Sequence, residues 1–405
     1  MQGCINKIKC HCCEAVFVVV SLYCLIVSSA FAESCSPGES STEVRLGMST
    51  ALSGPSQHLG LAMLQGVQKR IDEENCLPFW RNKGVYFKLL VKDDSYDPVV
   101  AETNVRQLID KDKVVAIVGN VGTPTAKRTW PIANESQVVF YAPYTGANIL
   151  RLDPPAPYVF NFRASYEQEI KAIVRAILEQ GTPVKHIGLF LQDDAFGQAG
   201  VLAVQKVLNE ICGDCGQNIF QMRYKRNTLN IHEALSAFVN KKEKPMAVIL
   251  IGASEASADF IEFSHPLSPK TQFYCLSFTG ASTLNLRLKT NSAKVYMSQV
   301  IPTDKEWKSW LESISLPDEL LNGSEEVSSF NEVAKEGYMA TGLLIAAMRT
   351  IPKAINGESL KDSLLQMERR LNTDGQLLDQ QMLDVVWLTE VGNSQSQYKA
   401  DKHND

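Results

Sequence analysis

One short module recurs four times between Val114 and Ser282, and it constrains the fold more than any other feature of the chain. Each copy is a continuous apolar run followed by a loop of small and hydroxyl-bearing residues, and a helical segment follows most copies. The copies are VVAIVGNVGTPTAKR (114–128), VVFYAPYTGAN (138–148), HIGLFLQDDAFGQAG (186–200) and MAVILIGASEASADF (246–260). Uninterrupted apolar strands that alternate with helices predict an α/β fold, with parallel sheets covered by helices on both faces.

Polar residues follow these strands where a parallel sheet binds its ligands. They are Thr123, Thr125, Thr145, Ser254 and the neighbours Asp193 and Asp194. In open parallel sheets, ligands lie outside the carboxyl ends of the strands. The module therefore predicts that the chain binds a small molecule.

Composition agrees with a globular protein of two domains. The chain has 405 residues, of which 45% are hydrophobic and 21% charged, and its formal net charge is −5. This length is sufficient for two hydrophobic cores. The acidic balance gives no basic surface for nucleic acid, so no nucleic-acid partner is expected.

Residues 1–32 are expected to be a cleaved secretory signal peptide. Lys7 and Lys9 give a positive start, an apolar stretch covers 15–27, and Ala30-Phe31-Ala32 has the small-x-small pattern that a signal peptidase requires. The alternative is an uncleaved membrane anchor, but the apolar stretch is short for a span of about 20 residues. We therefore expect an exported soluble protein.

Five cysteines remain once this leader is set aside, and an oxidising compartment favours disulfides among them. Cys212 and Cys215 form a CxxC that follows a helix, which indicates a local disulfide rather than a redox motif. Cys35 and Cys76 are a possible second pair. Cys275 lies in an apolar strand and is expected to be a buried thiol.

The strands and helices divide into two sets. We expect an N-terminal lobe of residues 44–160 plus about 300–370, and a C-terminal lobe of 161–299 plus about 371–392. Extended segments near 158–164 and 295–302 would cross between the lobes. Residues 393–405 are polar and are expected to form a frayed tail.

Several segments of the chain, in this order and spacing, resemble type I periplasmic solute-binding proteins of branched-chain amino acid ABC transporters, the leucine/isoleucine/valine-binding protein family. The matching segments are LSGPSQHLG (52–60), VKDDSYDPVVA (91–101), VVAIVGNVGTPT (114–125), VFYAPYTGAN (139–148), YVFNFRASYEQE (158–169), IGLFLQDDAFGQAG (187–200) and FYCLSFTGAS (273–282). The resemblance implies two Rossmann-like lobes joined by three hinge crossovers, which close on one ligand. It also implies a periplasmic location, an ABC permease of the inner membrane as partner, and a monomer.

The resemblance also implies which residues contact the ligand. The first lobe would contribute Ser53, His58, Leu59, Thr123, Tyr144, Thr145 and Gly146, and the second lobe Phe196, Ser254 and Ser277. Amino-acid binders of this family carry an acidic residue at the position of Ser277 and often an aromatic one at that of Leu59. The ligand's ammonium group would thus lack its usual partner, and Asp194 is the candidate replacement.

Each of these residues also has a purely structural interpretation. Thr123 precedes a proline and is expected to cap the helix that follows, whose N-terminus would suit a carboxylate. Asp193 and Asp194 are more typical of a helix start than of acid–base catalysis. Ser254 lacks the second glycine of a nucleophile elbow. The scattered histidines lack metal-binding spacing, and no phosphate-binding glycine motif occurs, so neither a metal nor a cofactor is expected.

We therefore predict that the chain is not an enzyme but an exported receptor for a small polar solute, carboxylate-like or amino acid-like. The first alternative is a sensory module with the same fold, which presents its closed form to a chemoreceptor or a kinase. The second alternative is an enzyme whose cleft uses Asp193 and Asp194.

Overall fold

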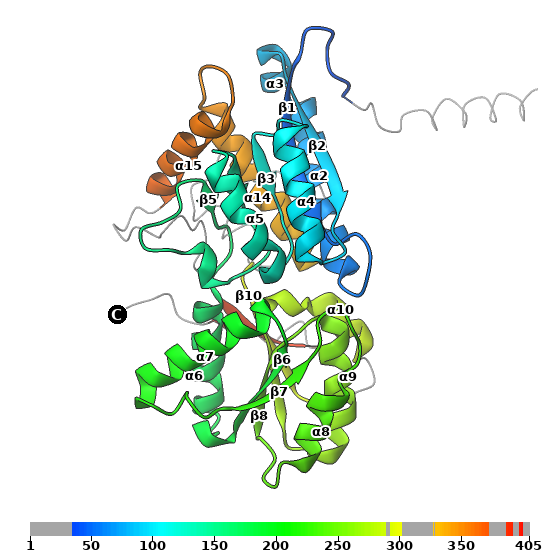
Figure 1. The fold of residues 1–405 in the computed structure, drawn as a ribbon, viewed down its shortest axis with the longest axis vertical. Coiled ribbons are helices and arrows are strands. Elements are labelled where there is room, and N and C mark those ends of the chain that lie inside the picture. The colour runs from blue at the N-terminus through cyan, green and yellow to red at the C-terminus, as the bar shows by residue number, and fades with distance from the viewer. Residues whose placement is uncertain are drawn as a thin grey trace, which may run out of the picture.

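A computed structural model of the protein describes residues 35–288, 292–301, 327, 329–371, 386–391 and 397–399. The described chain forms two lobes, each built around one sheet with helices on both faces (Figure 1). The predicted α/β fold with two lobes is confirmed.

The first sheet is entirely parallel, with the strand order β2-β1-β3-β4-β5. Its strands are β1 (Thr42–Thr50), β2 (Val85–Asp93), β3 (Ala116–Val118), β4 (Val139–Tyr141) and β5 (Val159–Phe160). Alternate residues of the central strands enter different cores. Ala116 and Val118 pack in one core and Ile117 in another, because successive side chains of a strand point to opposite faces.

Helices cover both faces of this sheet. They are α2 (Gln57–Cys76), α3 (Pro78–Lys83), α4 (Pro98–Asp110), α5 (Thr123–Glu135), α14 (Glu332–Arg349) and α15 (Gly357–Leu371). Helices α4 and α5 cover the face that contains Ile117, whereas α2 and α14 cover the other. Asp97 caps α4 as predicted, since its carboxylate accepts hydrogen bonds from the backbone N–H groups of Val99 and Val100.

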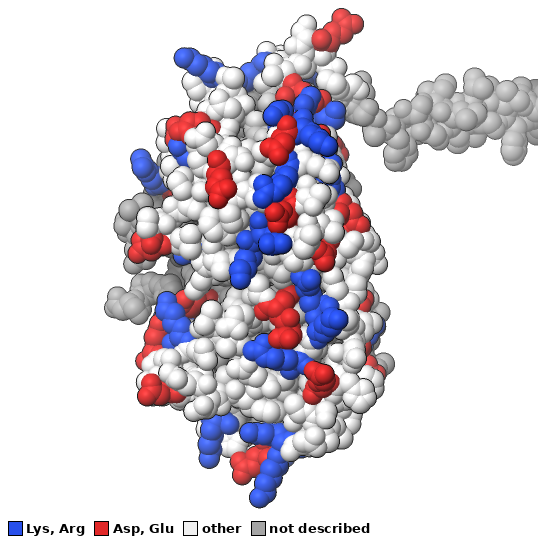
Figure 2. All heavy atoms as spheres, in the orientation of Figure 1, with Lys and Arg blue, Asp and Glu red and all other residues white. Residues whose placement is uncertain are grey.

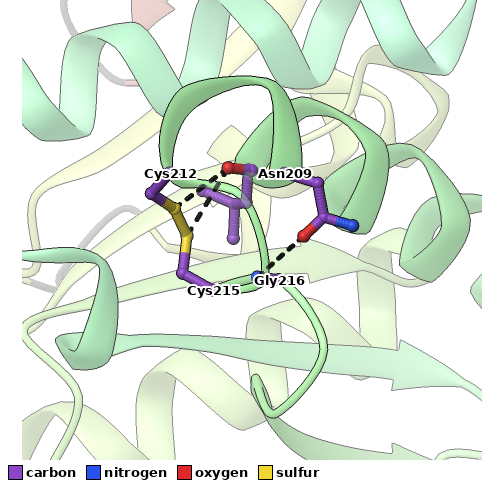
Figure 3. Close-up of a disulfide and its surroundings, with 5 residues drawn as sticks. Asn209, Cys212, Cys215 and Gly216 are labelled. Atoms are coloured by element: carbon purple, nitrogen blue, oxygen red, sulfur yellow. Dashed lines mark hydrogen bonds between the residues drawn. A yellow bond between two sulfur atoms is a disulfide. The ribbon is translucent and has the colours of Figure 1, made fainter.

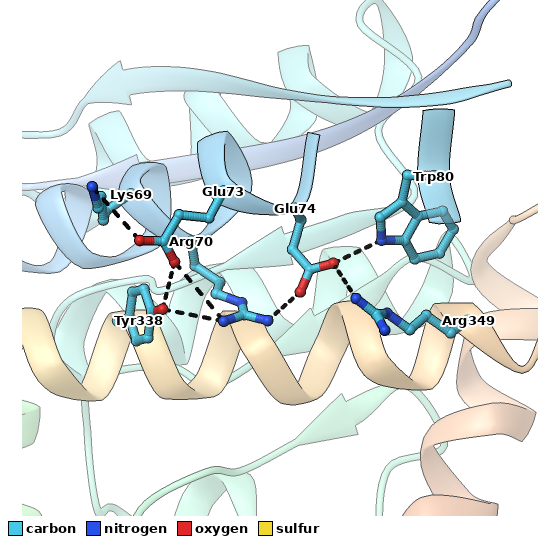
Figure 4. A network of polar contacts seen from close by, with 7 residues as sticks. All are labelled: Lys69, Arg70, Glu73, Glu74, Trp80, Tyr338 and Arg349. Carbon is cyan, nitrogen blue, oxygen red and sulfur yellow. Dashed lines mark hydrogen bonds and ion pairs between the residues drawn. The ribbon is translucent and has the colours of Figure 1, made fainter. Parts of the chain in front are cut away.

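Helices α2 and α14 are also joined by a buried ionic network (Figure 4). The Glu74 carboxylate contacts the Arg70 guanidinium, accepts from Trp80 Nε1 at 2.7 Å and lies 2.9 Å from Arg349 Nη2. Tyr338 of α14 accepts from Arg70 at 3.1 Å. This network joins α14, which comes late in the sequence, to the first lobe.

The second sheet has the order β12-β11-β10-β9-β8-β6-β7. Its strands are β6 (Ile187–Gln192), β7 (Phe220–Tyr224), β8 (Ala247–Ile251), β9 (Gln272–Cys275), β10 (Val295–Gln299), β11 (Trp387–Glu390) and β12 (Gln397–Lys399). Strands β6 to β10 are parallel, but β11 and β12 pair antiparallel at one edge. The sheet is therefore parallel as predicted, except at that edge.

Two segments of this sheet differ from what the sequence predicts. Residues 295–299 form β10 within the sheet, so the return crossing begins only after Gln299. Gln397–Lys399 pair with β11, so the prediction of a frayed tail is wrong for these residues. An exposed sheet edge offers unpaired backbone groups to any extended segment, whatever its side chains.

The helices of the second lobe are α6 (Tyr166–Glu179), α7 (Ala195–Cys212), α8 (His232–Asn240), α9 (Ser254–Ser264) and α10 (Ala281–Arg287). Ser165 and Gln168 form the predicted capping box of α6. Among the described elements, the chain passes between the sheets three times: after β5, after β10 and after α15. Parts of the second and third passages lie outside the described residues.

The structure contains the expected disulfide and the possible second one. Cys35 is bonded to Cys76, and Cys212 to Cys215 at the end of α7 (Figure 3). Beside the second bridge, the Asn209 carboxamide oxygen accepts from the backbone N–H of Gly216 at 3.2 Å, which fixes the connection to β7. Cys275 is a buried free thiol, as predicted.

The predicted signal peptide lies outside the described residues. Among the residues that the structure describes, no helix is both long and apolar enough to cross a membrane. No group of three or more His, Cys, Asp or Glu side chains in the same ranges is placed to hold a metal ion. On the face shown in Figure 2, acidic and basic side chains are interspersed.

Candidate ligand-binding site

The loops that follow the strands of the two sheets meet where the lobes face one another. Tyr144 Oη of the first lobe donates to the carbonyl of Ser277 in the second at 3.1 Å. Gln192 Nε2 donates to Tyr96 Oη at 3.2 Å. The two rims are thus in contact in this structure, as expected from the position of strand ends in parallel sheets.

Three hydroxyl groups converge at the first turn of α5. Thr123 Oγ1 is 2.7 Å from Thr145 Oγ1, which donates to Tyr166 Oη at 3.1 Å. The three side chains are almost entirely buried. Burial raises the pKa of Tyr166 to about 12, so this phenol stays protonated at neutral pH. The hydroxyls bond one another in this structure, and each can rotate to donate its single proton to an acceptor placed next to the helix N-terminus.

The predicted capping role of Thr123 is wrong. Thr123 is the first residue of α5, and Gly122 occupies the cap position with φ of 99°. A side chain at Gly122 would overlap the Tyr96 ring, because a Cβ there would lie 2.1 Å from the ring carbon Cε2. Glycine thus permits both the left-handed backbone and the close approach of Tyr96. This leaves the Thr123 hydroxyl free to join the cluster.

Five aromatic rings form a cluster that includes the ring of Tyr166. Tyr144 and Phe196, both predicted from the sequence, lie 5.6 and 4.5 Å from the Phe278 ring. Tyr166 lies 5.4 Å from Phe196, and Tyr96 lies 6.3 Å from Phe278. Such separations are typical of favourable ring pairs. The rings come from both lobes, so they form one cluster only when the rims meet.

Sequence reasoning missed Tyr96, Tyr166 and Phe278. Tyr96 follows β2 within VKDDSYDP, and Phe278 directly follows Ser277. Ligand-contacting residues follow the carboxyl ends of parallel strands, and this rule, which predicted Thr145, applies equally to Tyr96 and Phe278. Tyr166 belongs to α6 and carries no such signal, since it reaches the site only because Gly146 lets α6 approach. A Cβ on Gly146 would lie 2.6 Å from the backbone nitrogen of Tyr166.

Arg163 is a buried cation at the same place. Its Nη2 donates to Ser277 Oγ at 2.9 Å, and its Nε lies 3.1 Å from Glu336 Oε1 of α14. Burial lowers the pKa of Arg163, but the electrostatic attraction of Glu336, together with that of Tyr144 and Glu169, is larger. The pKa of Arg163 is therefore raised. Burial in turn raises the pKa of Glu336 to about 7, against the effect of Arg163. The pair connects the first crossover to α14.

Ser277 is held on three sides. Its backbone nitrogen donates to Glu169 Oε2 at 2.8 Å, its carbonyl accepts from Tyr144, and its hydroxyl accepts from Arg163. The Asp194 carboxylate already has two hydrogen-bond partners. It caps α7 by accepting from the Phe196 N–H, and it accepts from Gln192 Nε2 at 2.7 Å. Burial raises the pKa of Asp194.

The remaining predicted residues lie on the rims. His58 Nε2 is 2.9 Å from Ser254 Oγ across the interface, and burial lowers the pKa of this imidazole. Leu59 is buried close to Gly280 of the second lobe. Ser53 instead bonds Asp93 and Ser95 of its own lobe, at 2.6 Å each. Of these three first-lobe residues, the structure thus brings His58 and Leu59, but not Ser53, to the contact between the lobes.

Comparison with known proteins identifies the family. A family model described as periplasmic binding protein matches residues 43–391. The chain belongs to the periplasmic binding protein family. This confirms the resemblance drawn from the sequence, and the family consists of binding proteins, in agreement with the prediction that the chain is not an enzyme. No curated protein matches the chain by sequence.

Solved structures show the same fold. A possible leucine/isoleucine/valine-binding protein from Rhodopirellula baltica SH 1 is 29% identical with a TM-score of 0.74, over 90% of this chain and 98% of that one. The leucine-binding protein LivK from Thermotoga maritima MSB8 is 16% identical with a TM-score of 0.69, over 88% and 98%. A solute-binding protein from R. palustris, solved with benzoate, is 17% identical with a TM-score of 0.67, over 89% and 96%.

Proposed function

We propose that this periplasmic binding protein is the solute receptor of an ABC importer, and that it captures a small carboxylate between its lobes. The observation that carries this proposal is the convergence of the Thr123, Thr145 and Tyr166 hydroxyls at the N-terminus of α5, together with a cluster of aromatic rings contributed by both lobes. Hydroxyl donors and the positive end of a helix dipole favour an anion.

The proposed lobes are residues 44–160 with about 300–370, and residues 161–299 with about 371–392. Sheet membership supports this division, since β1 to β5 form one sheet and β6 to β12 the other. An open form would bind the carboxylate on the first lobe. Closure would then add Tyr166, Phe196, Phe278 and Ser277 from the second lobe and exclude water.

The proposed setting is the periplasm, after cleavage of the leader. The receptor would act as a monomer, and its closed form would dock on an ABC permease of the inner membrane. Family membership and the names of the similar structures support this setting.

A thermal-shift screen tests the proposal. Aromatic and aliphatic carboxylates, amino acids and uncharged amides are each added to the purified protein. A ligand that binds only the folded state raises the melting temperature in proportion to RT ln(1 + [L]/Kd). We expect carboxylates to stabilise the protein and the matching amides not to do so. Stabilisation by amides alone would contradict a carboxylate site.

A further inference from the structure

The Arg163 guanidinium lies inside the candidate site rather than beside it. Its side chain is 1% exposed, and its central carbon lies 4.1 Å from the centre of the Tyr144 ring. Tyr144 directly precedes Thr145 of the hydroxyl cluster. The cation therefore contacts the rim that would bind the carboxylate.

The Nη1 group of this guanidinium makes no hydrogen bond. Nη2 donates to Ser277 Oγ, and Nε lies 3.1 Å from Glu336 Oε1 in an ion pair that lacks hydrogen-bond geometry, whereas the buried Nη1 has no hydrogen-bond partner. A buried polar group without a partner is unfavourable, so an acceptor brought to Nη1 would be bound. Because Glu336 already balances the charge, a neutral acceptor suits this position better than a second anion.

Apart from Glu336, which forms the ion pair with Arg163, one acidic side chain near the site is a competitor for an ammonium group, namely Glu169. Asp194 is bonded by Phe196 and Gln192, and Glu332 by Ser282. Glu169 has one unpartnered oxygen, Oε1, which an ammonium group would suit. Its other oxygen is held by the Ser277 N–H and by Ser298 Oγ, within the second lobe. Arg163, in contrast, contacts the rim that carries Thr145.

We propose that the ligand carries a neutral hydrogen-bond acceptor, bound by Arg163 Nη1, in addition to its carboxylate, and that it lacks an ammonium group. The aromatic cluster calls for an apolar body. The ligand class is thus a 2-oxo or 2-hydroxy acid with an aliphatic or aromatic side chain. This inference rests on the proposed function and makes Arg163 a specificity-determining residue.

Calorimetry with matched ligands tests the inference. One series is 4-methyl-2-oxopentanoate, leucine and 4-methylpentanoate; the other is phenylpyruvate, phenylalanine and 3-phenylpropanoate. Each series holds the carbon skeleton constant while the second group is an acceptor, an ammonium or a hydrogen. In at least one series we expect the oxo acid to bind tenfold or more tightly than both relatives. An amino acid that binds as tightly as its oxo acid overturns the inference.

Two variants test whether Arg163 causes the preference for the oxo acid. Arg163→Lys keeps a cation opposite Glu336 but removes the guanidinium fork, and it should reduce the ratio of oxo-acid to unsubstituted-acid affinity to near one. Arg70→Lys is the matched control, since it makes the same change in the buried pair with Glu74 away from the site; it should preserve the ratio. A ratio unchanged in Arg163→Lys overturns the inference.

The variant Glu169→Gln tests whether Glu169 binds an ammonium group of the ligand. If Glu169 bound an ammonium group, this variant would lose amino-acid binding selectively, and that result also overturns the inference. Failure of the inference differs from failure of the proposed function. In the first case carboxylates bind without a preference for the oxo acid, and in the second no carboxylate binds. The ligand series on the unmodified protein decides the matter even if a variant fails to fold.

Discussion

At the scale of residues, the site depends on hydroxyls and turns whose roles are set by their neighbours. Thr145 is bonded to both Thr123 and Tyr166, so it is central to the proposed carboxylate site. Asp94 accepts from Ser49 Oγ at 2.8 Å and from the Tyr96 N–H at 2.9 Å. It thereby holds Ser95 and Tyr96 in their left-handed conformations, with φ of 50° and 58°.

Replacing Thr145 tests the carboxylate site. Thr145→Val keeps the shape but removes the hydroxyl, and it is expected to weaken carboxylate binding by about 1.5–3 kcal/mol, the usual contribution of a hydrogen bond to a charged group. Thr145→Ser keeps the hydroxyl and is the control. Calorimetry measures both, and equal affinities for the two variants would contradict the proposed role.

Asp94 is expected to make stability depend on pH. Burial raises its pKa from 3.8 to about 6, against the hydrogen bonds from Ser49 and Tyr96. The folded state thus binds a proton that the unfolded state releases near pH 4. This contribution is complete below about pH 4 and is lost as the pH rises through about 6.

Urea unfolding between pH 4 and 7 checks this prediction. The difference of about two pKa units corresponds to about 3 kcal/mol at most. Asp94→Asn should therefore show a shallower fall in unfolding free energy over this range than the unmodified protein. Parallel curves for the two proteins would show that Asp94 does not titrate in this way.

At the scale of elements, α14 is the late segment that completes the first lobe. It packs against α2 through a stripe of apolar residues and through Glu74 with its two arginines. Gly66 of α2 allows this close approach, because a Cβ there would lie 1.9 Å from the Ala334 carbonyl oxygen. The α2–α14 interface therefore combines close packing with a buried ionic network.

Removing Glu74 should be costly for stability. Glu74→Ala removes the fully buried carboxylate that pairs with Arg70 and Arg349. The carboxylate contact that Arg70 then keeps is the longer one of 3.9 Å with Glu73. The loss of one member of a buried pair typically costs about 3–5 kcal/mol. Glu102→Ala breaks the exposed contacts with Arg106 and Arg128 and should cost at most about 1 kcal/mol. Chemical unfolding compares the two variants, and similar losses would refute the distinction.

At the scale of the whole molecule, the two lobes meet through bonds that can exist only when the rims touch. Glu332 at the start of α14 accepts from the Ser282 hydroxyl at 2.8 Å and from its backbone N–H at 3.1 Å. Asn227 donates to the Ser95 carbonyl at 3.1 Å. Under the proposed function, these bonds contribute to affinity by favouring closure.

Glu332→Ala is expected to weaken ligand binding about tenfold by destabilising the closed form, since it removes two hydrogen bonds to a charged group. Calorimetry measures the affinity, and small-angle scattering measures the radius of gyration, which should fall less on ligand addition than in the unmodified protein. Asn240→Ala, on an exposed helix of the second lobe, is the control. Unchanged affinity in Glu332→Ala would show that this contact does not contribute to closure.

The sequence by itself determined the alternating strands and helices, the caps at Asp97 and Ser165, and the strand-end positions of Thr145, Phe196 and Ser277. Those features depend on hydrophobic periodicity and on hydrogen bonds between residues close in the chain. The tertiary structure alone decided that Thr123 joins a hydroxyl cluster instead of capping, that Tyr166 and Phe278 complete the ring cluster, and that Arg163 pairs with Glu336. Contacts such as Tyr144–Ser277, 133 positions apart, and Arg163–Glu336, 173 positions apart, join segments that are distant in the chain, and only the packing of the sheets and helices of the two lobes brings them together.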